Sequence, residues 1–394
     1  MTSIFLAELG ITCALGAGRA QVAEALFATT PLRGLTRHAG MVVDQEIMLG
    51  SVNAALPDTS DAPRRYQGRN NALLLHALEQ IRPAVDRAIA RHGPARVAVV
   101  LGTSTSGVGE SEVAQVHRLR HGAWPENFEY AQQEMGTPAH WIARLLGILG
   151  PAHVISTACS SSAKALASAA RMLRAGMVDA VVAGGADSLC AFTIAGFRSL
   201  ESVAVDRCNP FSANRRGINI GEGAALFLLD REDGPVRLLG WGESSDAHHM
   251  SAPEPSGRGA ADAIGQAMQR AGLHPTDIDY INLHGTATVQ NDAMESQVVA
   301  QLFGSGTPCS STKPLTGHAL GAAGAIEAGL SWLTLVDNPC AQLPPHWWDG
   351  VRDPALPPLR MVAPGETAAR PPRHVLSQSF AFGGSNAALV LGHA

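Results

Sequence analysis

Apolar, β-branched runs alternate with alanine- and leucine-rich runs along this chain of 394 residues. Between the apolar runs, Ala163, Leu166, Ala167 and Ala170 recur at helical spacing within residues 161–175, and residues 318–335 show a similar helical pattern. Strands that alternate with helices predict an α/β fold around a largely buried sheet. The runs expected to form buried strands are 96–101 (RVAVVL), 178–183 (VDAVVA), 278–283 (IDYINL) and 387–391 (AALVL).

A short pattern occurs twice, 163 residues apart: AALFL begins at Ala224 and AALVL at Ala387, and each follows a pair of glycines. A charged Gly-Pro junction at residues 231–236 (REDGPV) lies between the copies. We therefore predict two similar halves, residues 1–234 and 235–394. The same offset relates Cys159 to Ala322, so we expect one helix from each half to bring its N-terminal end to the centre of the molecule.

Composition and charge exclude several classes of protein. Apolar residues make up 46% and charged residues 16% of the chain, and the net charge is −5, which argues against disorder and against bulk nucleic-acid binding. No run reaches about 18 uninterrupted apolar residues, and the N-terminus lacks the basic start of a signal peptide. The 6 cysteines are widely spaced without a CxxC pair, so we expect neither a zinc site nor a disulfide framework, and a cytoplasmic location.

Cys159 is the first candidate for chemistry. It lies in VISTACSSS, where a short strand runs through a Ser/Thr-rich turn into a helix. The unpaired N–H groups and the dipole of a helix N-terminus favour a thiolate and would also stabilise an oxyanion. The alternative is a buried structural cysteine.

Three further segments carry candidate groups. His284 leaves the carboxyl end of a strand in NLHGTATVQND, where functional groups of α/β sheets gather. Lys313, which with Lys164 is one of only two lysines in the chain, precedes His318 in STKPLTGHALGAAGAIE. The glycines of this segment lack nucleotide-loop spacing and favour close helix packing. SFAFGGSN contains a Gly-Gly pair that permits positive φ angles. The alternatives are a turn histidine for His284, a surface charge for Lys313 and a simple turn for SFAFGGSN. One cysteine together with two histidines nevertheless indicates a thiol nucleophile.

These motifs, in this order from GTSTSGVGE at Gly102 to the terminal AALVLG, resemble the β-ketoacyl-acyl carrier protein synthases, the condensing enzymes of fatty acid and polyketide synthesis. The resemblance implies a thiolase-like fold of two similar βαβαβ halves in a five-layered αβαβα arrangement, normally a dimer. It implies an acyltransferase that performs a decarboxylative Claisen condensation between an acyl thioester on Cys159 and malonyl-acyl carrier protein. Segments CNPFSAN and GINIGE are closer to synthases of aryl polyene pathways.

The resemblance also implies roles for individual residues. Cys159 resembles the acyl-accepting nucleophile, and the backbone N–H groups of Cys159 and Phe382 would form the oxyanion hole. No metal or redox cofactor is expected, because the substrates are carried on the phosphopantetheine of acyl carrier protein. The other matching site residues are His284 and His318, which act on the malonyl thioester; the supporting charged pair Lys313 and Glu327; the gating phenylalanines Phe382 and Phe380; and Asp246, His248 and Met250 in a loop near the pocket mouth.

One position departs from the family pattern, because Arg216 stands where an acidic residue is common, and this departure leaves the role of that position open.

The expected partner is acidic acyl carrier protein, docked on Arg64, Arg65 and Arg69 with Arg207 nearby. The spacing of the first three predicts one helical face. We expect a homodimer or a heterodimer with a chain-length-factor-like subunit, and no nucleic acid or membrane partner.

Three alternatives compete with this interpretation. A non-catalytic chain length factor typically lacks the cysteine, so Cys159 argues against it. Degradative thiolases and initiating synthases carry other residues where His318 stands, so His318 argues against both. An acyl-binding or scaffold protein without turnover is the third, and only an assay would exclude it.

Overall fold

The computed structural model describes residues 3–42, 45–336 and 338–394, and its main feature is a strand order that occurs twice. Numbered along each half, both sets of five strands lie in the order 3-2-4-5-1, with the same parallel and antiparallel pairs. The N-terminal set is β1 (Phe5–Cys13), β5 (Val97–Gly102), β6 (Ala152–Ile155), β7 (Ala180–Asp187) and β8 (Gly223–Asp230); the C-terminal set is β9 (Val236–Ser245), β10 (Tyr280–Asn282), β11 (Pro308–Ser310), β13 (His374–Ala381) and β14 (Ser385–His393).

A short contact between β1 and β9 joins the two sets into one 12-stranded sheet, with Leu6 opposite Val236. Two short strands complete this sheet: β12 (Arg360–Met361) extends the C-terminal edge, and β2 (Gly16–Ala17) pairs with β1. A separate hairpin consists of β3 (Thr36–His38) and β4 (Ile47–Leu49). The change from one set to the other falls between Asp230 and Val236.

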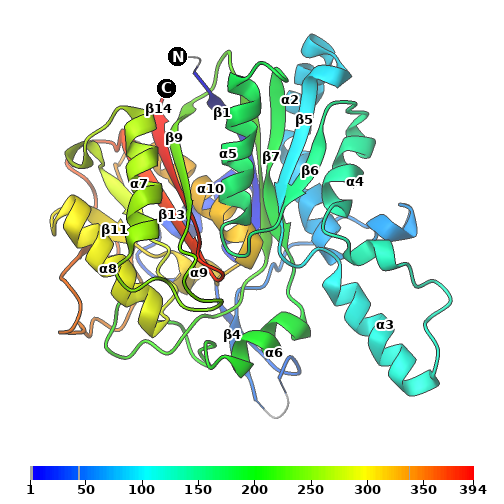
Figure 1. Cartoon of the computed structure of the whole chain (residues 1–394), viewed down its shortest axis with the longest axis horizontal. Helices are drawn as coiled ribbons and strands as arrows, with labels where there is room; N and C mark the ends of the chain where they lie inside the picture. Colours follow the sequence, from blue (N-terminus) through cyan, green and yellow to red (C-terminus); the bar gives the residue numbers. More distant parts are fainter. Residues whose placement is uncertain (1–2, 43–44, 337) are drawn as a thin grey trace.

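Helices cover both outer faces of the bent sheet and fill the space between its halves (Figure 1). The predicted α/β fold with two similar halves in five layers is thereby confirmed. The outer helices are α2 (Arg69–His92) and α4 (Thr137–Leu146) on the N-terminal half and α7 (Arg258–Ala271) and α8 (Val289–Phe303) on the C-terminal half, with α5 (Ser161–Arg174) and α10 (Ala323–Leu335) between them; α1 (Arg19–Leu26), α3 (Val108–His121), α6 (Ala191–Ser199) and α9 (Lys313–Thr316) lie outside this pattern.

The four predicted strands and the first predicted helix are confirmed as β5, β7, β10, β14 and α5. The second predicted helix, residues 318–335, was wrong at its start, because α10 begins at Ala323 after a 3₁₀ turn. The His318 N–H donates to Asn219 O at 2.7 Å, and His318 O accepts from Gly221 N at 2.9 Å. These strand-like bonds use the backbone groups of His318 that a helix would need.

The N-terminal ends of α5 and α10 meet at the centre, as the repeat predicts. The Ala325 N–H donates to Ser162 Oγ at 2.8 Å, and these two residues are 163 apart in sequence. A Cβ on Gly324 would lie 2.8 Å from the Cβ of Ala163, so only glycine allows this approach. Close helix packing therefore accounts for this glycine.

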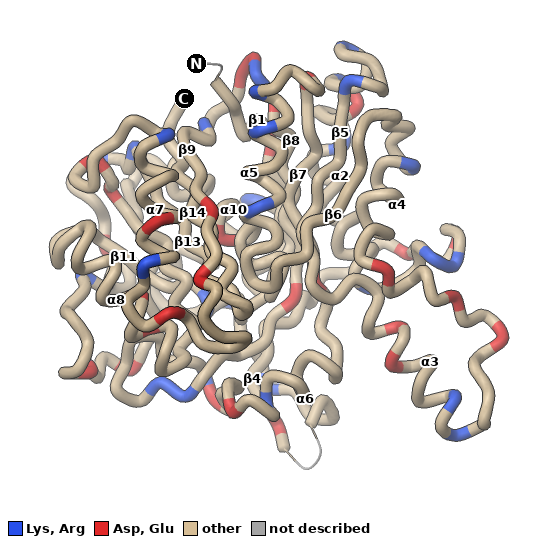
Figure 2. Tube along the Cα trace, viewed as in Figure 1, with Lys and Arg blue, Asp and Glu red and all other residues tan. Residues whose placement is uncertain are grey.

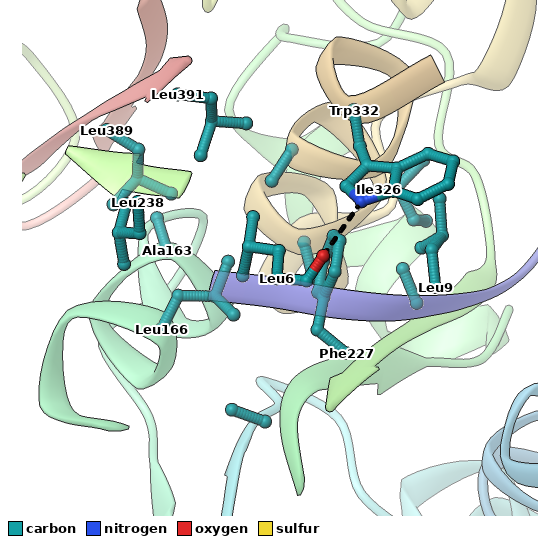
Figure 3. Close-up of a cluster of buried hydrophobic side chains, with 14 of the residues drawn as sticks. Leu6, Leu9, Ala163, Leu166, Phe227, Leu238, Ile326, Trp332, Leu389 and Leu391 are labelled. Carbon is teal, nitrogen blue, oxygen red and sulfur yellow. Dashed lines mark hydrogen bonds between the residues drawn. The ribbon is translucent and has the colours of Figure 1, made fainter. Parts of the chain in front are cut away.

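The central core ties the two halves together (Figure 3). The fully buried Trp332 of α10 donates its indole N–H to Leu6 O of β1 at 3.1 Å. The same cluster includes Phe227 from β8 and Leu389 from β14. Acidic and basic residues are interspersed on both halves (Figure 2), and in the described part of the chain no helix is long and apolar enough to cross a membrane.

Candidate active site

Cys159 lies in a sharp turn between β6 and α5, two residues before the helix begins. Its neighbour Ala158 has a φ of 52°, a strained conformation for a residue with a side chain. The hydroxyl of Ser161 holds the turn, because it accepts from Thr157 N at 2.9 Å and donates to Ala158 O at 2.6 Å. The turn fixes the Cys159 thiol at the innermost end of α5.

Three buried side chains meet at this point from both halves of the molecule. His318 Nε2 lies 2.9 Å from Cys159 Sγ. The rings of His284 and His318 are nearly perpendicular, with centroids 5.4 Å apart. One ligand atom from each of Cys159, His284 and His318 lies within 4.8 Å of the others, so one small group would contact all three. A soft metal such as Zn²⁺ would fit the same atoms and would compete for the sulfur.

Lys313 is buried and uses its ammonium to organise His284. Its Nζ donates to Glu327 Oε1 and to His284 O, and lies 3.4 Å from His284 Nδ1. Because an ammonium group only donates, Nδ1 must accept, and the ring proton of His284 is placed on Nε2. The Lys313–Glu327 pair thus aims an N–H of His284 into the pocket.

Burial controls the ionisation of the three central groups. It lowers the pKa of both His284 and His318 well below the usual value, and the charge of Lys313 lowers them further, so both imidazoles are neutral at pH 7. Burial raises the pKa of the Cys159 thiol to about 12, while Lys313 and the Phe382 N–H act in the opposite direction. Burial therefore opposes the thiolate that a helix N-terminus favours, and the raised pKa indicates a protonated thiol at rest.

A pocket of about 600 Å³ leads to these groups. Phe380 and Phe382 both line it, and the Phe380 ring lies 6.0 Å from that of His284. The Phe382 ring lies 5.5 Å from Phe197, and its backbone N–H lowers the pKa of the Cys159 thiol. That N–H is placed where an oxyanion on an attached acyl group would need a donor.

The Gly-Gly turn after Phe382 is bonded to the predicted loop at the pocket mouth. Gly383 and Gly384 have φ angles of 84° and 73°. The Gly383 N–H donates to Met250 O and the Asp246 N–H to Gly384 O, both at 2.8 Å. Asp246 lines the pocket, whereas His248 is exposed. Arg216 is also exposed and, within the described residues, takes part in no ion pair.

Two buried acids of α8 shape the turn after His284, and the sequence reasoning missed both. Glu295 accepts the N–H groups of His284 at 2.6 Å and Gly285 at 2.7 Å. Asp292 accepts that of Ala287 at 3.2 Å. Asp292 ends the NLHGTATVQND segment and Glu295 follows three residues later, so the two acids share one helical face, and this spacing could have found them.

Asp187 at the end of β7 supports the His318 side of the site. Its carboxylate accepts from Ser104 N at 2.9 Å, from Thr105 N at 2.9 Å and from Gly321 N at 2.6 Å. It thereby ties the GTSTSGVGE segment to the turn that follows His318. No pattern in the sequence singled out this acid.

We expect Glu295 to make a contribution to stability that declines as the pH rises from 6 to 8. Burial raises the pKa of this carboxyl from 4.5 to about 8. Between these values the folded chain binds a proton that the unfolded chain releases, so raising the pH favours unfolding. Between pH 6 and pH 8, the change in the free energy of unfolding in urea should be more negative for the wild type than for Glu295→Gln by on the order of 2 kcal/mol. Glu79→Gln, which removes an exposed acid of α2, should follow the wild type. Parallel pH profiles for the wild type and Glu295→Gln would contradict the assignment.

The predicted docking arginines do not share a helical face. Arg64 and Arg65 lie in a separate 3₁₀ turn, and α2 begins at Arg69 after Gly68. Arg69 forms a two-pronged pair with the buried carboxylate of Glu222. The half-buried Arg207 donates to Pro314 O at 2.6 Å. Internal bonds thus engage Arg69 and Arg207, and the shared-face prediction was wrong because Gly68 interrupts the helix.

Comparison with known proteins agrees with this geometry. The beta-ketoacyl synthase N-terminal domain matches residues 37–234, and the beta-ketoacyl synthase C-terminal domain matches residues 236–345. The chain is 38% identical over 261 residues to 3-oxoacyl-[acyl-carrier-protein] synthase 2 of Rhizobium meliloti (strain 1021), an alignment that spans 61% of each protein.

Similar solved structures cover the whole chain, among them a ketosynthase and a beta-ketoacyl synthase. The ketosynthase ApeO, in complex with its chain length factor ApeC from Xenorhabdus doucetiae, is 48% identical with a TM-score of 0.91 over 100% of this chain and 98% of that one. A beta-ketoacyl synthase from Burkholderia phymatum STM815 is 28% identical with a TM-score of 0.87 over 100% of both chains. Since the two domain matches together take up most of the sequence, the chain belongs to the beta-ketoacyl synthase family.

Proposed function

We propose that the protein is a 3-oxoacyl-[acyl-carrier-protein] synthase that condenses an acyl group on Cys159 with a malonyl thioester. The observation that carries this proposal is the buried cluster of one thiol and two neutral imidazoles, in which Lys313 fixes the tautomer of His284. A non-catalytic chain length factor would not need this cluster.

The first step transfers the acyl group. Cys159 Sγ attacks the thioester carbonyl of acyl-phosphopantetheine, and its proton passes to His318 Nε2 at 2.9 Å. The carbon–sulfur bond to pantetheine breaks, and the leaving pantetheine thiolate accepts this proton from His318 Nε2. His318 Nδ1 has no partner among the described residues, so this ring is not held in one tautomer and is able to accept a proton here.

The second step forms the carbon–carbon bond. Nε2–H groups of His284 and His318 bind the thioester oxygen of the malonyl group, and loss of CO₂ places the electron pair on that oxygen as an enolate. The carbon of the enolate attacks the carbonyl carbon of the Cys159 thioester. The resulting oxyanion accepts hydrogen bonds from the backbone N–H groups of Cys159 and Phe382. The intermediate collapses to the 3-oxoacyl thioester and the Cys159 thiolate, which takes a proton from water.

The test uses octanoyl-pantetheine and malonyl-acyl carrier protein as substrates. We expect one CO₂ for each 3-oxodecanoyl product, measured by CO₂ capture and by intact mass of the carrier protein. A bound octanoyl group without product would instead support an acyl-binding protein without turnover. CO₂ release without a new carbon–carbon bond would also contradict the proposed reaction.

We propose a heterodimer with a chain-length-factor-like subunit as the assembled form. An apolar groove of about 1620 Å³ lies between α3, α6 and the segment of Trp124 and Phe128, with Val113 71% and Phe192 68% exposed. The sheet edge at β6 and the projecting α3 lie on the same side of the N-terminal half (Figure 1). The 48% identity to ApeO, which was solved with a chain length factor, favours such a subunit over a second copy as the occupant. Native mass spectrometry after co-expression with candidate partners should show a 1:1 heterodimer, and a homodimer would overturn this choice.

Carrier-protein docking is proposed to depend on Arg65 rather than on Arg69. The side chain of Arg65 is 53% exposed and pairs with Glu129 at 2.8 Å, whereas Arg69 holds a buried acid. Arg65→Glu should raise the KM for carrier-bound substrate and flatten its salt dependence, because such contacts act mainly through encounter rates. The kcat/KM with pantetheine thioesters should stay unchanged. Equal losses with both substrates would indicate a folding defect instead, and no loss with either would place docking elsewhere.

Aryl polyene biosynthesis is the pathway that we propose among those of this family. The segments CNPFSAN and GINIGE and the likeness to ApeO support it. The protein would be incubated with malonyl units and the pathway's other enzymes, and the product would be analysed. A polyene chain would support this pathway, and a saturated fatty acid would contradict it.

A further inference from the structure

Helix α6 contributes one residue to the lining of the active-site pocket and buries few of its side chains within the chain. Its residue Phe197 lines the pocket and contacts the gating Phe382, with ring centroids 5.5 Å apart. In this fully described helix, Ile194 is the only buried side chain. Apart from the groove proposed for a partner subunit, α6 therefore depends largely on polar contacts within the chain to hold its place.

The polar contact at its start comes from another helix. Glu112 of α3 accepts the N–H of Ala191 at 3.1 Å and also that of Phe192. These are the first two N–H groups of α6, and the N-cap residue Cys190 supplies no side-chain cap of its own. A carboxylate at a helix N-terminus satisfies free donors and complements the helix dipole.

We propose that Glu112 is a positioning residue for the acyl gate. By capping α6 it fixes Phe197, and through Phe197 it holds Phe382 against the space beside Cys159. Glu112 therefore helps to set which acyl chains gain access to the nucleophile. This inference rests on the proposed function, since it concerns the acyl donors of that same site.

Loss of Glu112 should favour long acyl donors over short ones. Loss of the cap frees the N-terminal turn of α6, and the pocket wall formed by Phe197 then gives way more easily to a long chain. A short chain needs no such displacement. Selection between short and long acyl donors should therefore shift toward long donors, while decarboxylation by His284 and His318 should not change.

The experiment compares acylation of Cys159 by acetyl- and octanoyl-pantetheine, measured by intact mass, in the protein together with any subunit that co-purifies. In Glu112→Ala the octanoyl-to-acetyl ratio of kcat/KM should rise by roughly 3- to 10-fold, the effect of one lost helix cap. Hydrogen–deuterium exchange of residues 189–200 should become faster. CO₂ release from malonyl-pantetheine should stay within about 2-fold of the wild-type rate.

Two variants make the test specific. Glu110 lies in the same turn of α3 but accepts the Arg69 N–H at 2.8 Å, so it caps α2 instead. Glu110→Gln should therefore leave the donor ratio and the exchange of α6 unchanged. Glu112→Gln keeps one acceptor oxygen and should shift the ratio in the same direction by less, and it replaces Glu112→Ala if that variant fails to fold.

Each outcome decides one claim. An unchanged donor ratio in a folded variant overturns the gate role, even if α6 exchanges faster. Unchanged exchange overturns the capping role. If the wild type itself is not acylated, the proposed function fails, and the exchange data still decide whether Glu112 holds α6.

Discussion

Replacing Cys159 by alanine should abolish the covalent acyl adduct and the condensation that depends on it. Wild-type protein incubated with acyl-pantetheine should gain the mass of one acyl group, and Cys159→Ala should gain none. We expect condensation to fall by on the order of 10⁴-fold or more, since loss of a nucleophile leaves only the contribution of binding and oxyanion donors. Intact mass spectrometry and product analysis measure the two effects.

The control for this experiment is a second buried thiol. Cys309 lies in β11, in the outer core of the C-terminal half, where its pKa is also raised by burial. Cys309→Ala should acylate at the wild-type rate, which would show that a buried thiol as such is not enough. An adduct that persists in Cys159→Ala, or that moves to Cys190 or Cys208, would refute the assignment of the nucleophile.

Residue types and their places beside strand ends or helix starts singled out Cys159, His284 and His318, and the family resemblance assigned all three to one site. Cys159, His284 and His318 come from three loops, and the 163-residue repeat predicted that two of these loops meet. The equal strand order of the two halves follows from the same repeat. Such local patterns predict positions in the folded protein because the sheet fixes where the ends of its strands lie.

What the sequence did not predict depends on partners that are distant along the chain. Arg69 looked like a surface cation, but its partner Glu222 is 153 residues away and fully buried. The neutral state of Cys159 follows from burial by elements of both halves, which no local pattern records. The capping of α6 by Glu112 joins residues about 80 apart. Such contacts require the tertiary structure.

Replacing either histidine by alanine should reduce CO₂ release from malonyl-pantetheine by on the order of 100- to 1000-fold, the usual effect of losing one preorganised donor. The two variants should differ in acyl transfer. His318 Nε2 lies 2.9 Å from Cys159 Sγ, so His318→Ala should also slow acylation of Cys159. His284 has no such contact with the sulfur among the described residues, so His284→Ala should be acylated at close to the wild-type rate.

This difference separates a donor from a proton acceptor. Asparagine keeps an N–H donor but no basic nitrogen, so His318→Asn should recover part of the decarboxylation and none of the acylation. His140→Ala, which removes an exposed histidine of α4, should change neither rate. Because both imidazoles have pKa values well below 6.5, the wild-type decarboxylation rate should stay level from pH 6.5 to pH 8. Normal decarboxylation by His318→Ala, or a rate that falls as the imidazoles lose a proton within that range, would show that the two rings do not act as neutral donors to the enolate.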